Sequence, residues 1–238
     1  MKKKGENTSK PLSIYIKLEP NLLTIEQIKQ LLSTAQGHPL NMLVTVALTT
    51  GLRSSEIVGL RWQDLDREDA LLHVRQIILP LGKKEAPKAA RTIALPKISL
   101  GALGEQRSGQ DEVRAKAGEA WHDLGLVFPN GRGQYLDPST LGRQSPALFA
   151  AAGLPPLRFH DLRHTTAAFL LAMGAHPQVV QTILGYRSMS TTFNTLVPVS
   201  LSMQREVMQK WDDLFLEEGI SPHQSNWQAN NVENQEDA

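Results

Sequence analysis

The 238-residue sequence contains no cysteine. This absence excludes disulfides, thiolate metal sites and cysteine nucleophiles, and it suits a reducing compartment such as the cytoplasm. No apolar run approaches the length that a membrane-spanning helix needs. The basic start, residues 1–10, is not followed by the apolar segment of a secretory signal. We therefore expect a cytoplasmic protein without a membrane segment.

Aromatic residues are also few, and the net charge is small. Aromatic side chains make up 5% of the chain, and three of them are tyrosines. The formal net charge of +1 argues by itself against a nucleic-acid partner. Residues 217–238, however, contain acidic residues and no lysine or arginine, and they are poor in apolar residues. We expect this end to be disordered, which leaves the remaining body of the protein basic.

The remaining composition is that of an ordinary globular protein. Apolar residues account for 41% of the chain and charged residues for 21%. This length is sufficient for one large domain with flexible ends. We expect a leader over residues 1–20, one domain over 21–215 and an acidic tail over 216–238.

The hydrophobic periodicity predicts a mainly α-helical domain with a small antiparallel β-sheet, an α+β fold. Thr24 is the expected N-cap of the first helix, with Gln27 as its capping-box partner, and Gly51 is expected to end the second. Ser54 or Ser55 is the expected cap of the third. Helices are expected over 21–35, 40–50, 54–66, 138–153, 158–174, 176–185 and 200–216, a mostly helical stretch over 97–125, and a short strand with a glycine-rich loop over 126–135.

The period changes to two in the middle of the chain. Residues 70–79 alternate with β-branched side chains, and residues 91–96 have the pattern of a returning strand. The intervening segment, 82–90, is rich in turn-forming and charged residues. The pattern predicts a β-hairpin that carries three lysines at its tip, namely Lys83, Lys84 and Lys88.

Two short strings place an arginine beside a helical pattern. They are T-T-G-L-R-S-S-E-I, which contains Arg53, and H-D-L-R-H-T-T, which contains His160 and Arg163. The last two lie three residues apart and share one helix face. Two convergent guanidiniums with an imidazole suit the binding of a phosphate, and polar groups at a helix start also favour an anion. The simpler alternative for Arg53 is a surface ion pair with Glu56 or Asp64.

A metal site is a second interpretation of the same histidines. His160 and His164 have the i, i+4 spacing of the zinc-protease helix. That helix needs a glutamate after the first histidine, whereas Asp161 stands there with a shorter side chain. Arg163 would also repel a cation. A metal-dependent hydrolase is therefore a remote alternative.

The string T-G-L-R-S-S-E-I-V-G-L-R-W-Q-D-L-D, a hairpin lysine and H-D-L-R-H-T, in this order, resemble the catalytic domain of tyrosine recombinases, the phage integrase family. The resemblance runs from about Leu22 to Trp211. It implies a protein that binds double-stranded DNA and breaks and rejoins its strands in site-specific DNA recombination and integration. It also implies that no metal and no nucleotide cofactor is used, and that a homo-oligomer, a tetramer, forms on DNA.

The resemblance also assigns roles to the polar residues. It implies that Arg53, His160 and Arg163 bind the scissile phosphate. Glu56 matches the acidic residue that steadies the first arginine, and His164 is a supporting residue. Catalysis of this kind consists mainly of positioning and charge stabilisation, so fixed guanidiniums can replace a metal ion.

A hairpin lysine of the family protonates the leaving 5′ oxygen, and Lys88 is the candidate here, with Lys84 as the alternative. Two positions depart from the family pattern. Tyr186 stands where the second histidine is expected, and Leu196 stands where the nucleophilic tyrosine is expected. Leucine has neither a nucleophile nor a hydrogen-bonding group.

Three explanations of these departures remain open. The chain is a relative that binds DNA without cleaving it and regulates recombination sites, Tyr186 serves as a displaced nucleophile, or the gene carries a recent or engineered change. Full members of the family also carry a helical DNA-clamping domain before the catalytic one. About twenty residues precede the first expected helix here, so we expect this clamp to be absent or truncated.

Overall fold

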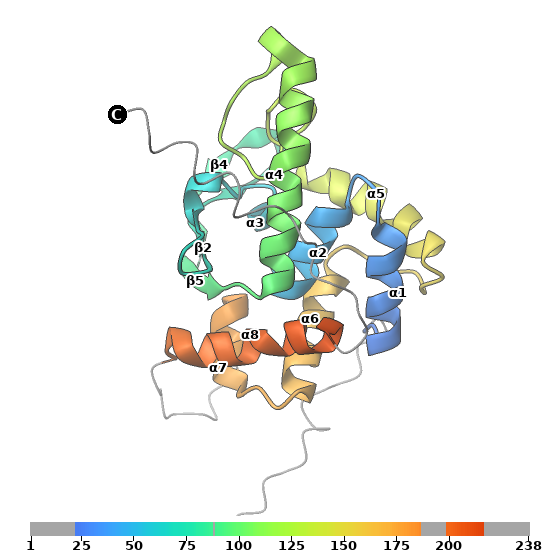
Figure 1. Cartoon of the computed structure of the whole chain (residues 1–238), viewed down its shortest axis with the longest axis vertical. Helices are drawn as coiled ribbons and strands as arrows, with labels where there is room; N and C mark the ends of the chain where they lie inside the picture. The colour runs from blue at the N-terminus through green and yellow to red at the C-terminus, as the bar shows by residue number, and fades with distance from the viewer. Residues whose placement is uncertain (1–21, 88, 187–198, 217–238) are drawn as a thin grey trace, which may run out of the picture.

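The structure is a computed structural model that describes residues 22–87, 89–186 and 199–216. Within these ranges, helices surround the buried helix α2, and two small antiparallel sheets lie to one side of them (Figure 1). None of the described helices is long and apolar enough to cross a membrane. The mainly helical α+β fold expected from the sequence is confirmed.

The helices are α1 (Ile25–Ala35), α2 (Asn41–Thr50), α3 (Ser54–Ile57), α4 (Lys97–Ala117), α5 (Pro138–Ala151), α6 (Asp161–Ala172), α7 (Pro177–Leu184) and α8 (Leu201–Leu216). Short 3-10 turns are η2 (Trp62–Asp64), η3 (Pro80–Gly82) and η4 (Gly118–Ala120). The strands are β1 (Leu65–Asp66), β2 (Leu71–Val74), β3 (Ile77–Ile78), β4 (Lys84–Glu85) and β5 (Arg91–Ala94). One sheet has the order β1-β2-β5, and β3 pairs with β4 in the other.

Helices α1 and α2 form as their end signals predict. The Gln27 backbone N–H donates to the Thr24 hydroxyl over 3.2 Å, and the Thr24 N–H donates to the Gln27 side chain over 2.9 Å. Helix α2 is buried along nearly its whole length and packs against both α4 and α6. It ends at Gly51, whose φ of 64° lies in the left-handed region that favours glycine. This ending turns the chain directly into Arg53.

The helix expected over 54–66 is wrong beyond Ile57. Helix α3 is a single turn, and the chain then continues into η2 and β1. Gly59 marks the change, because a Cβ there would come within 3.1 Å of the Gln76 carbonyl oxygen. The expected serine cap is also wrong, since the N-cap is Arg53, whose N–H donates to Glu56 Oε2 over 2.9 Å.

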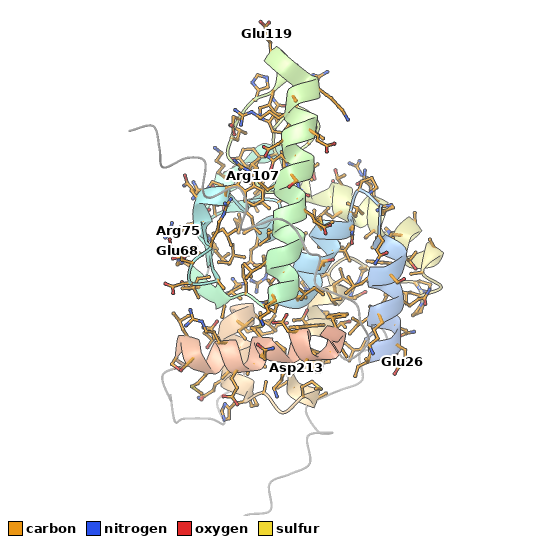
Figure 2. The ribbon with its side chains drawn as sticks, viewed as in Figure 1. Glu26, Glu68, Arg75, Arg107, Glu119 and Asp213 are labelled. Atoms are coloured by element: carbon orange, nitrogen blue, oxygen red, sulfur yellow. The ribbon has the colours of Figure 1, made fainter. Side chains whose placement is uncertain are left out.

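The single hairpin expected from 70–79 and 91–96 is divided into two ladders. Strands β2 and β5 pair antiparallel as expected, but the β2 ladder stops at Val74. The Gln76 side chain donates to the Gly59 carbonyl over 2.7 Å, and Arg75 pairs with the buried Asp64 over 3.5 Å. These contacts turn the chain, and β3 and β4 form their own hairpin around η3. Figure 2 shows Arg75 on the outer side of the strands.

The strand expected within 126–135 is replaced by irregular chain. The described residues there make two isolated antiparallel bridges, one between Arg61 and Leu126 and one between Pro129 and Tyr135. The first bridge ties this loop to the residue before η2, and the second pairs two residues of the loop with each other.

Helix α8 lies across the N-terminal end of α4 (Figure 1). The Asp212 carboxylate accepts hydrogen bonds from the N–H groups of Lys97 and Ile98, at 3.0 and 3.1 Å, and so caps α4 from another element. Trp211 stacks on Phe169 of α6 with ring centroids 4.0 Å apart. In Figure 2, Asp213 marks α8 and Glu119 marks the opposite end of α4.

Candidate phosphate-binding site

Arg53 lies at the joint between α2 and α3, where the sequence analysis expects it. Its Nη1 donates to Glu56 Oε1 over 2.9 Å. The Arg53 side chain is 37% exposed, whereas that of Glu56 is 2% exposed. The carboxylate therefore holds the arginine from inside the protein and leaves part of the guanidinium open to solvent.

A second arginine holds the same carboxylate, and it is absent from the expected site residues. Arg91, at the start of β5, donates from Nη1 to Glu56 Oε1 over 3.0 Å and from Nη2 to Glu56 Oε2 over 3.1 Å. Its side chain is 5% exposed. Burial alone would raise the pKa of Glu56, but the hydrogen bonds and charges of Arg91 and Arg53 outweigh burial and lower it. Glu56 is therefore a carboxylate shared by two guanidiniums.

Arg163 lies on α6 and is almost completely buried, with 1% of its surface exposed. Its Nη1 donates to the Gly51 carbonyl and its Nη2 donates to the Leu184 carbonyl, each over 2.6 Å. Burial lowers the pKa of Arg163, although a guanidinium stays protonated in proteins. Arg163 thus ties the end of α2 to the end of α7.

The three arginines converge on the C-terminal end of α7. A helix end carries carbonyl groups without intrahelical partners and a partial negative charge, which attracts cations. Gly185, with a φ of 67°, ends α7, and a Cβ there would come within 2.9 Å of Arg91 Nη1. The bonds to three successive carbonyls run from Arg91 to Ile183 (2.7 Å), from Arg163 to Leu184 (2.6 Å) and from Arg53 to Gly185 (3.5 Å).

We call Arg53, Arg91 and Arg163 the arginine cluster. Arg53 directly precedes α3, Arg91 begins β5 and Arg163 lies on α6, and the chain separates Arg53 from Gly185 by 132 positions. The structure therefore brings Arg53 and Arg163 together, as the two sequence strings require. Glu56 is the carboxylate that pairs with two of these three guanidiniums, Arg53 and Arg91, so the cluster carries excess positive charge.

Tyr186 covers the buried arginine. Its ring lies over the Arg163 guanidinium, with 4.5 Å between Arg163 Cζ and the ring centroid, the geometry of a cation–π contact. The Nε atom of Arg163 is buried and has no hydrogen-bond partner among the described residues. The position expected to hold a second histidine therefore places a phenol beside the cluster.

His160 lies at the N-cap of α6, three residues before Arg163. Its side chain is exposed, and its ring packs edge-to-face with that of His164, with centroids 5.0 Å apart. Partial burial and the charges of His164 and Arg163 lower the pKa of His160. The imidazole is therefore mostly neutral at pH 7 and available as a hydrogen-bond donor.

The contacts around these histidines do not support a metal site. Asp161 is buried and accepts from the Arg158 guanidinium over 2.9 Å. Within residues 22–87, 89–186 and 199–216, no group of three histidine, aspartate or glutamate side chains is arranged to hold a metal ion. The hydrolase alternative thus has no third ligand in this part of the chain.

The structure describes only one of the two candidate catalytic lysines of the hairpin. Lys84 lies on β4, exposed, with its Nζ 5.0 Å from the centroid of the Tyr135 ring. Lys88 and Leu196, the expected general acid and the expected nucleophile position, both lie outside the described residues.

The sequence and the fold have counterparts among known proteins. The phage integrase family matches residues 21–197. A tyrosine recombinase XerC-like protein of Caldanaerobacter subterraneus subsp. tengcongensis is 31% identical over 84% of this chain and 56% of its own length. The prophage integrase IntR of Escherichia coli K12 is 28% identical over 72% of this chain and 46% of its own length. The chain spans about half the length of the curated relatives that it matches.

Solved structures give the same assignment for the fold. The Tn1549 transposon integrase in complex with transposon right end DNA matches with a TM-score of 0.64 and 22% identity, over 86% of this chain and 71% of that one. The XerA recombinase matches with a TM-score of 0.60 and 21% identity, over 84% of this chain and 64% of that one. The domain has the fold of tyrosine recombinase catalytic domains. The chain belongs to the phage integrase family.

Proposed function

We propose that the protein binds double-stranded DNA through a backbone phosphodiester at the arginine cluster and acts in site-specific DNA recombination and integration. The observation that supports this proposal most is the convergence of three guanidiniums, with one carboxylate, at the end of α7. A phosphodiester carries one negative charge and offers oxygens to guanidinium donors. Relatives named integrases and recombinases make DNA the natural source of that phosphate.

The two proposed phosphate arginines have different tasks. Arg53 is partly open to solvent, and its bond to Gly185 is the longest of the three, so it is free to exchange that carbonyl for a phosphate oxygen. His160, exposed and three residues before Arg163 on α6, would supply a second donor. Arg163 is held by two short hydrogen bonds and contributes a fixed positive charge from inside the protein.

We propose that the bound strand is not cleaved by the residue at the usual position. Leu196 has no group that attacks phosphorus. The protein would then occupy recombination sites and regulate them. The competing possibility, cleavage by Tyr186, is favoured by one observation, since this phenol lies against the Arg163 guanidinium.

Covalent trapping separates these two possibilities. A duplex with a nick close to the cleavage position releases a short fragment after attack, so a protein–DNA adduct accumulates. We expect the wild-type protein to bind the duplex and form no adduct. An adduct that disappears in Tyr186→Phe would instead establish Tyr186 as the nucleophile. The double change Tyr186→His with Leu196→Tyr should create adduct formation, and Arg53→Gln in that background should remove it again.

The lysine role is also part of the proposal. Lys88, with Lys84 as the alternative, would protonate the leaving 5′ oxygen in the repaired double variant. Substituting each lysine by alanine in that background should slow adduct formation only for the lysine that acts. A substrate with a better leaving group at the 5′ position should rescue that variant alone.

The proposal also covers the cofactors, the compartment and the assembly of the protein. The site needs neither a metal ion nor a nucleotide cofactor, because guanidiniums supply the positive charge. A DNA-binding role agrees with the cytoplasm, the compartment expected from the sequence. We propose that copies of the chain assemble on DNA, up to a tetramer, and crosslinking in the presence and absence of duplex DNA tests this assembly.

A further inference from the structure

The tip of the β3–β4 hairpin contains a leucine in an unusual state. Leu81 is fully exposed, at 100% of its surface. It also has a φ of 64° and a ψ of 19°, in the left-handed region. Bulky side chains rarely adopt this region, because the Cβ crowds the following carbonyl. The residue thus combines an unfavourable backbone with an apolar side chain that no described neighbour covers.

The hairpin backbone defines this tip. The Leu79 N–H donates to the Lys83 carbonyl over 2.8 Å, and the Gly82 N–H donates to the Leu79 carbonyl over 3.1 Å. Gly82 also has a positive φ, 73°, and a Cβ placed on it would have no neighbour within 4 Å. The turn therefore projects into open space, with Leu81 at its outermost part.

The base of the hairpin is fixed on two sides. Strand β3 packs on α3, the helix that begins directly after Arg53. On the other side, Lys84 lies over the Tyr135 ring at 5.0 Å. A rigid base allows a projecting side chain to transmit force to whatever it contacts. The contact of β3 with α3 also joins the hairpin to the helix that follows Arg53 of the arginine cluster.

The charge around the tip indicates the kind of partner. Lys83 is 71% exposed and pairs with Glu85 over 2.9 Å, and Lys84 is exposed as well. Two lysines and one glutamate leave a positive balance immediately beside Leu81. An apolar side chain with flanking cations matches a nucleic-acid groove, where phosphates line the rim and the base steps are apolar.

We propose that Leu81 is an apolar wedge that inserts between base pairs of the duplex bound at the arginine cluster, partly unstacking them. This inference rests on the proposed DNA binding and adds a contact that deforms the bound DNA. Side chains such as leucine unstack and kink duplexes in this way, most easily at flexible pyrimidine–purine steps. The strained turn holds the side chain outward before the DNA arrives, so insertion needs no rearrangement of the tip.

The test uses the full chain and a short duplex that contains 2-aminopurine in place of adenine at TA steps. Unstacking raises the fluorescence of this base, and anisotropy of an end label measures binding separately. We expect the wild-type protein to raise the fluorescence on binding. Leu81→Asn, whose side chain tolerates the left-handed region, should abolish the rise while weakening binding by less than about tenfold, since phosphate contacts supply most of the affinity.

Two controls make the result specific. Leu201→Asn removes an exposed leucine from α8, 37% exposed, and should leave the fluorescence rise unchanged. The melting temperature of Leu81→Asn should equal or exceed that of the wild type, because the new residue suits the backbone, so a lost signal would not reflect unfolding. Wild-type binding without any fluorescence rise, or an undiminished rise in Leu81→Asn, would overturn the wedge and leave DNA binding intact. No binding of the duplex by the wild type would overturn both proposals.

Discussion

Arg53 and Arg163 bring the same chemical group to the same helix end, yet their surroundings differ completely. Arg53 is 37% exposed and makes its longest bond, 3.5 Å, to Gly185. Arg163 is 1% exposed and makes two bonds of 2.6 Å to main-chain carbonyls. A guanidinium on the open side can exchange partners with a ligand. A guanidinium on the closed side is part of the protein interior, so its removal should damage the fold before it damages binding.

The largest expected effect is that of Arg163→Met. Methionine has a similar length but leaves the Gly51 and Leu184 carbonyls buried without donors. We expect the free energy of unfolding to fall by about 3–5 kcal/mol, as for removal of one partner from a buried charged network. Urea unfolding measures the loss. Arg53→Met is the matched control and should cost less than about 1 kcal/mol, and equal losses would show that the two sides do not differ.

A smaller loss is expected from Glu56→Gln, which removes the carboxylate between the open and closed sides. Arg91 and Arg53 both lose their charged acceptor, and Arg91 is buried. We expect a loss of about 2–3 kcal/mol in urea unfolding. Arg91→Met should destabilise the protein by a similar amount, because it removes the buried partner that makes two bonds to the Glu56 carboxylate. Additive losses in the double variant would contradict the direct coupling of these two residues.

The acid sensitivity of the protein should follow the same carboxylate. The pKa of Glu56 in the folded protein lies below the ordinary value of a glutamate. Stability from the charged form is therefore complete above the unfolded value and is lost as the pH falls through the folded pKa. Unfolding measured from pH 6 to pH 3, values that span the unperturbed glutamate pKa of about 4.3, should show a steeper loss for the wild type than for Glu56→Gln. Parallel curves would assign the acid loss to other groups.

On the open side, Arg53→Gln should weaken DNA binding with little effect on stability. We expect an affinity loss of about tenfold at low salt and a decrease of about one in the slope of affinity against salt, as for one lost phosphate contact. Fluorescence anisotropy across a salt series measures both. Arg114→Gln is the control, because this α4 arginine is 53% exposed and pairs with Asp123. An equal loss in the control would mean that binding is diffuse.

The smallest expected effect concerns His160. Its pKa is lowered, so the neutral imidazole predominates in the folded protein at pH 7. Protonation as the pH falls below the ordinary value of 6.5 adds a positive charge near the bound phosphate and should raise DNA affinity by about two- to threefold. The same protonation lowers stability, because the folded state favours the neutral form. His160→Asn should flatten the affinity profile, and His164→Asn tests whether the neighbouring ring contributes.

The elements that the sequence predicts well are those with local causes. Thr24 and Gln27 cap α1 through contacts three residues apart, and Gly51 ends α2 through its own backbone preference. The helical fold class follows from the same periodic patterns. The break after Val74 has a distant cause, because Gln76 donates to Gly59, 17 residues away. No local pattern in residues 70–79 reports that contact.

The site divides in the same way. Arg53, Glu56 and the pair of His160 and Arg163 are apparent in the sequence because each lies in a short polar string beside a helix. The part played by Arg91 could not be recognised, since its carboxylate partner lies 35 residues earlier and its carbonyl partner 92 residues later. An arginine at the start of a strand looks like an ordinary surface residue. The burial of Arg163 could not be predicted either, because its acceptors are main-chain carbonyls at the ends of two other helices.

The attachment of Arg163 to Gly51 spans 112 positions of the chain. A cation held in this way has no defined location until α2, α6 and α7 have all assembled, so the positive site cannot precede the native state during folding. Ligand occupancy should then report global unfolding rather than local fraying. Amide protons at the end of α7 should accordingly exchange at the rate of the slowest-opening part of the protein, and cleavage of the chain within α7 should erase anion affinity even where the rest of the fold survives.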